Sequence, residues 1–277
     1  MRVASSQDTS IAVHDLGGDG PTLLICHATG FCGGAYRPLA AALTPHHHVF
    51  ALDARGHGES TPPADGSFEW SGMADDVGAV AAAVGAVAPG PLHVVGHSMG
   101  GAAALLAEHR QPGTFTSAYL YEPIVPPGPV PAAPIGNPMA QAARRRREIF
   151  PSRRYALQRY ASRPPLHVLR ADSLAAYVEH GFEDVEDGVR LRCRGEHEAR
   201  TFEATGSIHA GMVGGLGLPT TVAVGGTDTG MVADFAPALV AALPHAILQR
   251  HPHLGHFGPL QDPVTIAAAI VTHTTGG

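Results

Sequence analysis

The stretch Leu92-His93-Val94-Val95-Gly96-His97-Ser98-Met99-Gly100-Gly101-Ala102 decides which fold is expected. Its apolar first half predicts a buried strand, and the small residues from Met99 onward predict a helix. The pattern Gly-x-Ser-x-Gly lies between them, and Gly96 and Gly100 relieve the crowding around a serine on a sharp strand-to-helix turn. We therefore expect Ser98 to be a nucleophile at the N-terminal end of that helix. A tight turn that merely contains a serine is the alternative interpretation.

Outward from this stretch, short apolar runs alternate with alanine-rich helical patterns. This alternation is typical of a doubly wound, mostly parallel sheet, so the fold class is predicted as α/β. The expected strands cover residues 11–14, 22–26, 48–52, 92–95, 118–121, 220–224 and 246–248, and the expected helices lie near 36–43, 70–87, 99–110, 232–243 and 263–271.

The pattern changes at Glu122-Pro123. Residues 123–210 begin with a proline-dense stretch and carry 13 arginines and 10 acidic residues, whereas the rest of the chain is acidic. We therefore expect a core formed by 1–122 and 211–277, with 123–210 as an inserted helical lid. The run Arg144–Arg147 is interpreted as a solvated helix face, with an anion-attracting rim as the alternative.

A nucleophilic serine needs a base and an acid that orients the base. His256 is the predicted base, because Leu254-Gly255-His256-Phe257 follows a late strand and precedes the last helix. Asp228 is the predicted acid. It follows the strand 220–224 after a short turn of two glycines and a threonine. Glu122 follows the strand 118–121 and is a rival for the same role.

A developing oxyanion needs backbone N–H donors. The N–H of Met99, the residue after the nucleophile, is the first predicted donor. The loop Cys26-His27-Ala28-Thr29-Gly30 follows a buried strand, and the N–H of Thr29 is the second.

Together, these residues resemble the α/β-hydrolase-fold serine hydrolases, an esterase- and lipase-like superfamily. The elbow at Ser98, the loop 53–60, Asp228 and the His256 turn match that family in order and spacing. One departure is Ala28, where the family usually has glycine. The family's dehalogenases and epoxide hydrolases carry aspartate as nucleophile, so Ser98 argues against both.

The resemblance implies hydrolysis of a small or medium ester, thioester or lactone through an acyl-enzyme on Ser98. Carbon–carbon bond hydrolysis or acyl transfer on the same triad is an enzymatic alternative. A ligand-binding protein without turnover is the alternative from another class.

The composition argues against several other classes of function. The net charge of −6 and pI of about 6.3 argue against nucleic-acid binding, and the absence of lysine excludes Schiff-base chemistry. Three cysteines favour a reducing compartment, and cytoplasmic localisation is expected. No apolar run is long enough for a membrane span. No cofactor and no metal are expected, although His251, His253 and His256 have metal-like spacing; a homodimer is left open.

Overall fold

The computed structural model describes the chain except residues 130–134, 206–207, 228–229, 231 and 277. Its main feature is an eight-stranded sheet with the strand order β1-β2-β4-β3-β5-β6-β10-β11. All neighbouring pairs from β4 to β11 are parallel, whereas β1–β2 and β2–β4 are antiparallel. The strands are β1 Arg2–Ala4, β2 Ser10–Asp15, β3 Thr22–Cys26, β4 His48–Leu52, β5 Leu92–His97, β6 Ser117–Tyr121, β10 Thr220–Gly225 and β11 Ala246–His251.

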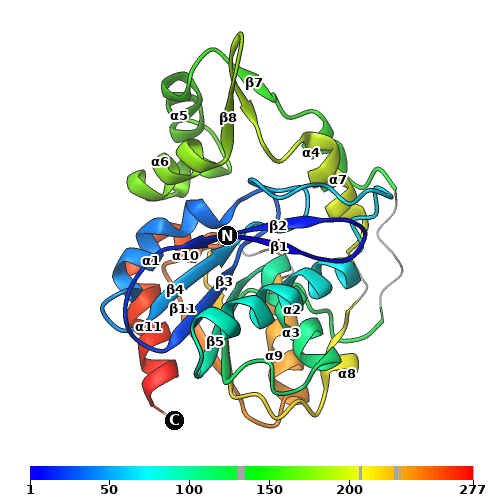
Figure 1. The fold of residues 1–277 in the computed structure, drawn as a ribbon, viewed down its shortest axis with the longest axis vertical. Helices are drawn as coiled ribbons and strands as arrows, with labels where there is room; N and C mark the ends of the chain where they lie inside the picture. The colour runs from blue at the N-terminus through cyan, green and yellow to red at the C-terminus, as the bar shows by residue number, and fades with distance from the viewer. Residues whose placement is uncertain (130–134, 206–207, 228–229, 231, 277) are drawn as a thin grey trace.

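Helices cover both faces of this sheet (Figure 1). Successive residues of a strand point to opposite faces, so Leu24 and Cys26 join one apolar core while Leu23 and Ile25 join the other. The first core is completed by α2, α3 and α9, and the second by α1, α10 and α11. The doubly wound α/β class is thereby confirmed. These helices are α1 Arg37–Leu43, α2 Trp70–Val87, α3 Met99–Arg110, α9 Val232–Ala242, α10 Gly258–Gln261 and α11 Pro263–Thr275, and a short 3₁₀ helix, η1, covers Gly33–Tyr36.

The segment between β6 and β10 carries a second, smaller sheet. This sheet is antiparallel, with the order β7-β9-β8. The segment is therefore not helical throughout, because Phe182, Val189 and Leu191 alternate with polar residues and pair as a hairpin. Figure 1 shows β7, β8, α5 and α6 on one side of the main fold. The elements are α4 Pro138–Arg144, β7 Ile149–Phe150, α5 Arg153–Ala161, η2 Leu166–Val168, α6 Ala171–His180, β8 Phe182–Val185, β9 Gly188–Leu191, α7 Gly195–Glu203 and α8 Ala210–Val213.

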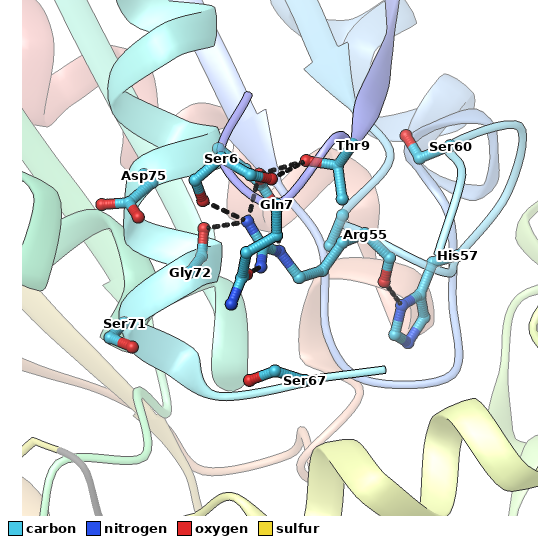
Figure 2. Close-up of polar contacts among 12 residues, drawn as sticks. Ser6, Gln7, Thr9, Arg55, His57, Ser60, Ser67, Ser71, Gly72 and Asp75 are labelled. Atoms are coloured by element: carbon cyan, nitrogen blue, oxygen red, sulfur yellow. Dashed lines mark hydrogen bonds and ion pairs between the residues drawn. The ribbon is translucent and has the colours of Figure 1, made fainter. Parts of the chain in front are cut away.

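A buried ion pair fixes the loop that follows β4. The Arg55 guanidinium is fully buried and donates to both carboxylate oxygens of Asp76 in α2, at 2.7 and 2.8 Å. It also donates to the Gly72 carbonyl at 2.7 Å and to the Ser6 hydroxyl at 3.0 Å (Figure 2). The loop after β4 is thus joined to α2 and to the segment between β1 and β2.

We expect Asp76→Ala to lower the free energy of unfolding by about 3–5 kcal/mol, because it leaves the Arg55 charge buried without its partner. The matched control is Asp75→Ala. Asp75 is the preceding residue and pairs with Arg110 where both side chains are about two-fifths exposed, so its loss costs at most about 1 kcal/mol. Urea denaturation of both variants measures the difference. Equal effects would contradict the assignment of this pair as a structural anchor.

Candidate active site

Ser98 lies in a strained turn between β5 and α3. Its backbone has φ +55° and ψ −118°, a conformation that non-glycine residues rarely adopt. The Ser98 N–H donates to the Tyr121 carbonyl at 3.0 Å, and its carbonyl accepts from Gly101 and Ala102 at the start of α3. These bonds hold the strained residue between the end of β6 and the helix.

The two glycines of the elbow are required by close backbone contacts. A Cβ at Gly96 would lie 2.4 Å from the Cα of Gly101, and a Cβ at Gly100 would lie 2.2 Å from the Cys26 carbonyl oxygen. From the sequence, the crowding was predicted to lie around the serine itself. In the structure the crowding is between strand and helix backbones, so the glycines set how closely α3 approaches β3 and β5.

A half-buried His256 pairs with a buried Glu122 in the same site as Ser98. The distance between His256 Nδ1 and Glu122 Oε2 is 2.7 Å, and Glu122 is fully buried. The second carboxylate oxygen, Oε1, accepts from the Gly225 N–H at 2.8 Å. Glu122 follows β6 with φ +44°, and β6 is the neighbour of β10, which ends at Gly225. The carboxylate thus bridges the ends of two adjacent strands.

The structure therefore brings His256 to Glu122, which the sequence named only as the rival acid. Asp228, the acid that the sequence favoured, lies outside the described residues. Both acids follow strands that end at the same edge of the sheet. Within the described residues, no hydrogen bond joins the Ser98 hydroxyl to the His256 ring. Such catalytic bonds are often long before substrate binds.

The loop after β3 holds the second predicted oxyanion donor. His27 fixes this loop, because its Nδ1–H donates to the Ala28 carbonyl at 2.8 Å and its Nε2 accepts from the Ala54 N–H at 2.9 Å. Burial lowers the pKa of His27, so the ring stays neutral and can do both. In the part of the chain that the structure describes, the N–H groups of Thr29 and Met99 donate to no protein acceptor.

A chain of hydrogen bonds joins the oxyanion loop to the base. The Ala28 N–H donates to the Tyr36 hydroxyl at 3.1 Å, and that hydroxyl donates to His97 Nδ1 at 2.6 Å. The opposite ring atom, His97 Nε2, donates to the His256 carbonyl at 2.7 Å. Burial, reinforced by the nearby His256, holds the pKa of His97 well below its usual value, so the ring stays neutral. Neither Tyr36 nor His97 was predicted from the sequence. Tyr36 lies in no motif, and His97 occupies a variable position of the Gly-x-Ser-x-Gly pattern.

We expect Tyr36→Phe to lower the free energy of unfolding by about 1–3 kcal/mol, because the Ala28 N–H and His97 Nδ1 both lose their partner in a buried site. Turnover of an activated ester should also fall, since the oxyanion loop and the base lose their common support. Tyr155→Phe is the matched control, because Tyr155 is exposed and its ring remains available to Arg147. Thermal melts and kcat measure the two effects. A Tyr36 variant as stable and as active as the control would contradict this role.

A cavity of about 470 Å³ lies over these residues. Ser98, His256 and Thr29 line it from the core of the fold, and the segment between β6 and β10 supplies most of the remaining wall. That wall is largely apolar and aromatic, from Met139, Ala142, Ala143, Phe150, Tyr160, Leu166, Tyr177 and Phe202. Such an enclosure suits an acyl chain of modest length.

The arginine run does not form a single solvated helix face. α4 ends at Arg144, so the three arginines that follow are not on that helix, and Arg145, Arg146 and Arg147 line the cavity. Of the four arginines, only Arg144 does not line the cavity. It forms ion pairs with Glu196 and Glu203 of α7, at 2.7 and 2.6 Å. The prediction of a helix face was wrong, because the helix stops where the run begins. Arg144, Arg145 and Arg147 are nevertheless exposed, as predicted for a solvated run, and Arg146 is half-buried.

The geometry and the comparisons agree on the family. The pattern of the alpha/beta hydrolase family matches residues 23–269, so the chain belongs to that family. Similar curated proteins include protein phosphatase methylesterase 1 of Bos taurus, 37% identical over 95 residues, and the pimeloyl-[acyl-carrier protein] methyl ester esterase of Methylococcus capsulatus, 36% identical over 103 residues. The first match covers 34% of this chain and 25% of the relative, and the second covers 37% of each. The chain thus matches a quarter to just over a third of these relatives' length.

A solved structure is similar over nearly the whole length. The crystal structure of E-2-(acetamidomethylene)succinate hydrolase superposes with a TM-score of 0.79 at 21% identity, covering 99% of this chain and 98% of the other. At this identity the likeness shows the fold. As to membranes, none of the helices in the described ranges combines the length and the apolar character of a membrane span.

Proposed function

We propose that this protein is a serine hydrolase in which Ser98 is the nucleophile, His256 the general base and Glu122 the acid that orients the base. The 2.7 Å bond from His256 Nδ1 to a fully buried carboxylate, beside a cavity that Ser98 lines, carries this proposal. The bond fixes the tautomer, because a proton held on Nδ1 leaves Nε2 as the acceptor.

In this mechanism the Ser98 hydroxyl attacks a carbonyl carbon while His256 Nε2 takes its proton. Glu122 stabilises the imidazolium that forms, without taking the proton itself. The same ring then protonates the leaving group, and an acyl-enzyme remains on Ser98. Water, deprotonated by His256, attacks the acyl carbonyl and releases the acid.

The negative charge on the attacked oxygen would be held by the N–H groups of Met99 and Thr29. Met99 begins α3, where the helix dipole favours negative charge, and Thr29 lies in the loop anchored by His27. One such donor is worth on the order of 3 kcal/mol of barrier height.

The substrate class that fits is a small or medium ester, thioester or lactone. The cavity volume supports this size, and two of the relatives are named as methyl esterases. Residues 123–210 would act as a lid, since they line the cavity opposite Ser98 and exclude water from it. The described cysteines are free and buried, which fits a cytoplasmic enzyme.

Labelling with a fluorophosphonate probe tests this function, because the probe reacts only with an activated serine. We expect one modified peptide, carrying the probe on Ser98, and turnover of 4-nitrophenyl esters of short acids. A folded protein that neither takes up the probe nor hydrolyses any ester, thioester or lactone of a chain-length panel would overturn the proposal.

A further inference from the structure

The cavity wall is strongly basic for a site with so much apolar surface. Among the residues that the structure describes, one acidic side chain lines it, Glu198, against five arginines: Arg145, Arg146, Arg147, Arg159 and Arg163. A neutral acyl substrate gives no reason for this excess of positive charge beside the nucleophile.

Three of the five arginines already have partners, and the first of them, Arg145, donates to Gln141 Oε1 at 3.4 Å. Arg146 pairs with Glu198 and donates to the Tyr177 hydroxyl at 2.9 Å. Arg147 donates to the Ile149 carbonyl at 2.7 Å and stacks on Phe150, with its Cζ 5.1 Å from the ring centroid. These side chains are held by contacts within the protein and form part of the cavity wall.

Arg159 and Arg163 differ from the others. Neither has a carboxylate partner or a side-chain hydrogen bond within the described residues, yet both line the cavity. Arg159 lies at the end of α5 and is half-buried beside Tyr160 and the apolar wall, whereas Arg163 lies in the turn after α5 and is exposed at the edge of the cavity. A guanidinium in such partly dry surroundings attracts an anion more strongly than one in water and can bind a carboxylate or phosphate through two parallel bonds.

Glu198 lies beside the loop that follows β3. Its carboxylate lies over Gly30, so close that a Cβ at Gly30 would be 2.6 Å from Glu198 Oε1. Thr29, the proposed oxyanion donor, is the preceding residue. The acidic side chain therefore lies beside the loop that holds Thr29, whereas Arg159 lies at the end of α5, which packs on α6 and η2, and Arg163 lies in the turn after it.

We propose that the enzyme acts on substrates that carry an anionic group, a carboxylate or a phosphate, and that Arg159 and Arg163 bind this group away from the scissile bond. The inference rests on the proposed function of Ser98. It makes Arg159 and Arg163 specificity-determining residues: the charge contact selects and orients the substrate, while the triad performs the chemistry.

Matched substrates test the charge preference and locate the anion. The first pair is mono-4-nitrophenyl glutarate and 4-nitrophenyl pentanoate, which differ in a carboxylate on the acyl chain. The second pair is the pentanoyl thioesters of 4′-phosphopantetheine and of pantetheine, which differ in one phosphate on the leaving group. We expect kcat/KM to favour the anionic member of one pair by about tenfold or more, as removal of a charged hydrogen bond typically costs, and to fall with added salt for that member.

In the double variant Arg159→Gln, Arg163→Gln this preference should shrink to about threefold or less. Arg154→Gln is the matched control, because Arg154 is exposed on the same helix and does not line the cavity. It should keep the wild-type ratio. The pair that shows the preference tells whether the anion belongs to the acyl group or to the leaving group.

The outcomes separate the two proposals. Equal kcat/KM within both pairs, with all four compounds hydrolysed, would overturn the anionic substrate class and leave the serine hydrolase intact. A preference that survives in the double variant, or that is lost equally in Arg154→Gln, would overturn the role of Arg159 and Arg163. Failure to hydrolyse any of the four, together with failure of fluorophosphonate labelling, would remove the serine hydrolase and this inference with it.

Discussion

Replacing Ser98 by alanine is expected to lower kcat for an activated ester by about a millionfold, the size of loss typical for a triad nucleophile. Without the hydroxyl no acyl-enzyme forms, and only the oxyanion donors and substrate positioning remain. The protein should stay folded, because the change removes one atom from a residue whose backbone bonds are all retained. Initial rates and fluorophosphonate labelling measure the loss.

Ser117→Ala is the matched control for this experiment. Ser117 is as buried as Ser98 but lies at the other end of the sheet's strands, hydrogen-bonded to His93 at 2.8 Å. Its loss should leave turnover within a few-fold of wild type. A Ser98→Ala protein that keeps activity within tenfold of wild type, in a preparation free of host esterases, would contradict the nucleophile assignment.

Glu122→Gln should lower turnover by about ten-thousandfold, the cost of a wrong tautomer at the base. The geometry explains why the amide cannot adapt. Oε1 accepts from the Gly225 N–H, so the amide oxygen must stay there and the NH₂ group must face His256. The amide would donate to Nδ1, move the ring proton to Nε2, and leave no acceptor for the Ser98 proton.

Asp228→Asn is the comparison that decides between the two acids. With Glu122 in the triad, the asparagine variant should be far more active than Glu122→Gln. Circular dichroism and thermal melts of both variants separate chemistry from folding. If Asp228→Asn were instead the crippling change, the acid would be Asp228, as the sequence alone predicted.

The buried strands and the elbow were predictable because they depend on local patterns. Apolar runs such as Thr22–Cys26 and His48–Leu52 have the predicted bounds, and the Gly-x-Ser-x-Gly pattern carries its own steric reason. The edge strand β1 was not predicted, since three residues at the chain start give no periodicity.

Local sequence could not decide between the two candidate acids. Asp228 and Glu122 both follow strands that end at one sheet edge, and the residue type alone favours neither. The contact of Glu122 with both His256 and the Gly225 N–H depends on the adjacency of β6 and β10 and on the positive φ at Glu122, neither of which a local pattern predicts. Likewise, counting arginines gave the charge of residues 123–210, but the end of α4 at Arg144, which separates this residue from the three cavity-lining arginines that follow, was not predictable from the count.

The hydrogen-bonded chain from Ala28 through Tyr36 and His97 to His256 has a consequence for how the enzyme loses activity. Oxyanion loop and base loop come from opposite ends of the sequence, yet each rests on the same two buried rings. Opening of either loop breaks bonds that position the other. With the roles proposed for Thr29 and His256, we therefore expect the two loops to open as one cooperative unit and activity to be lost in a single step.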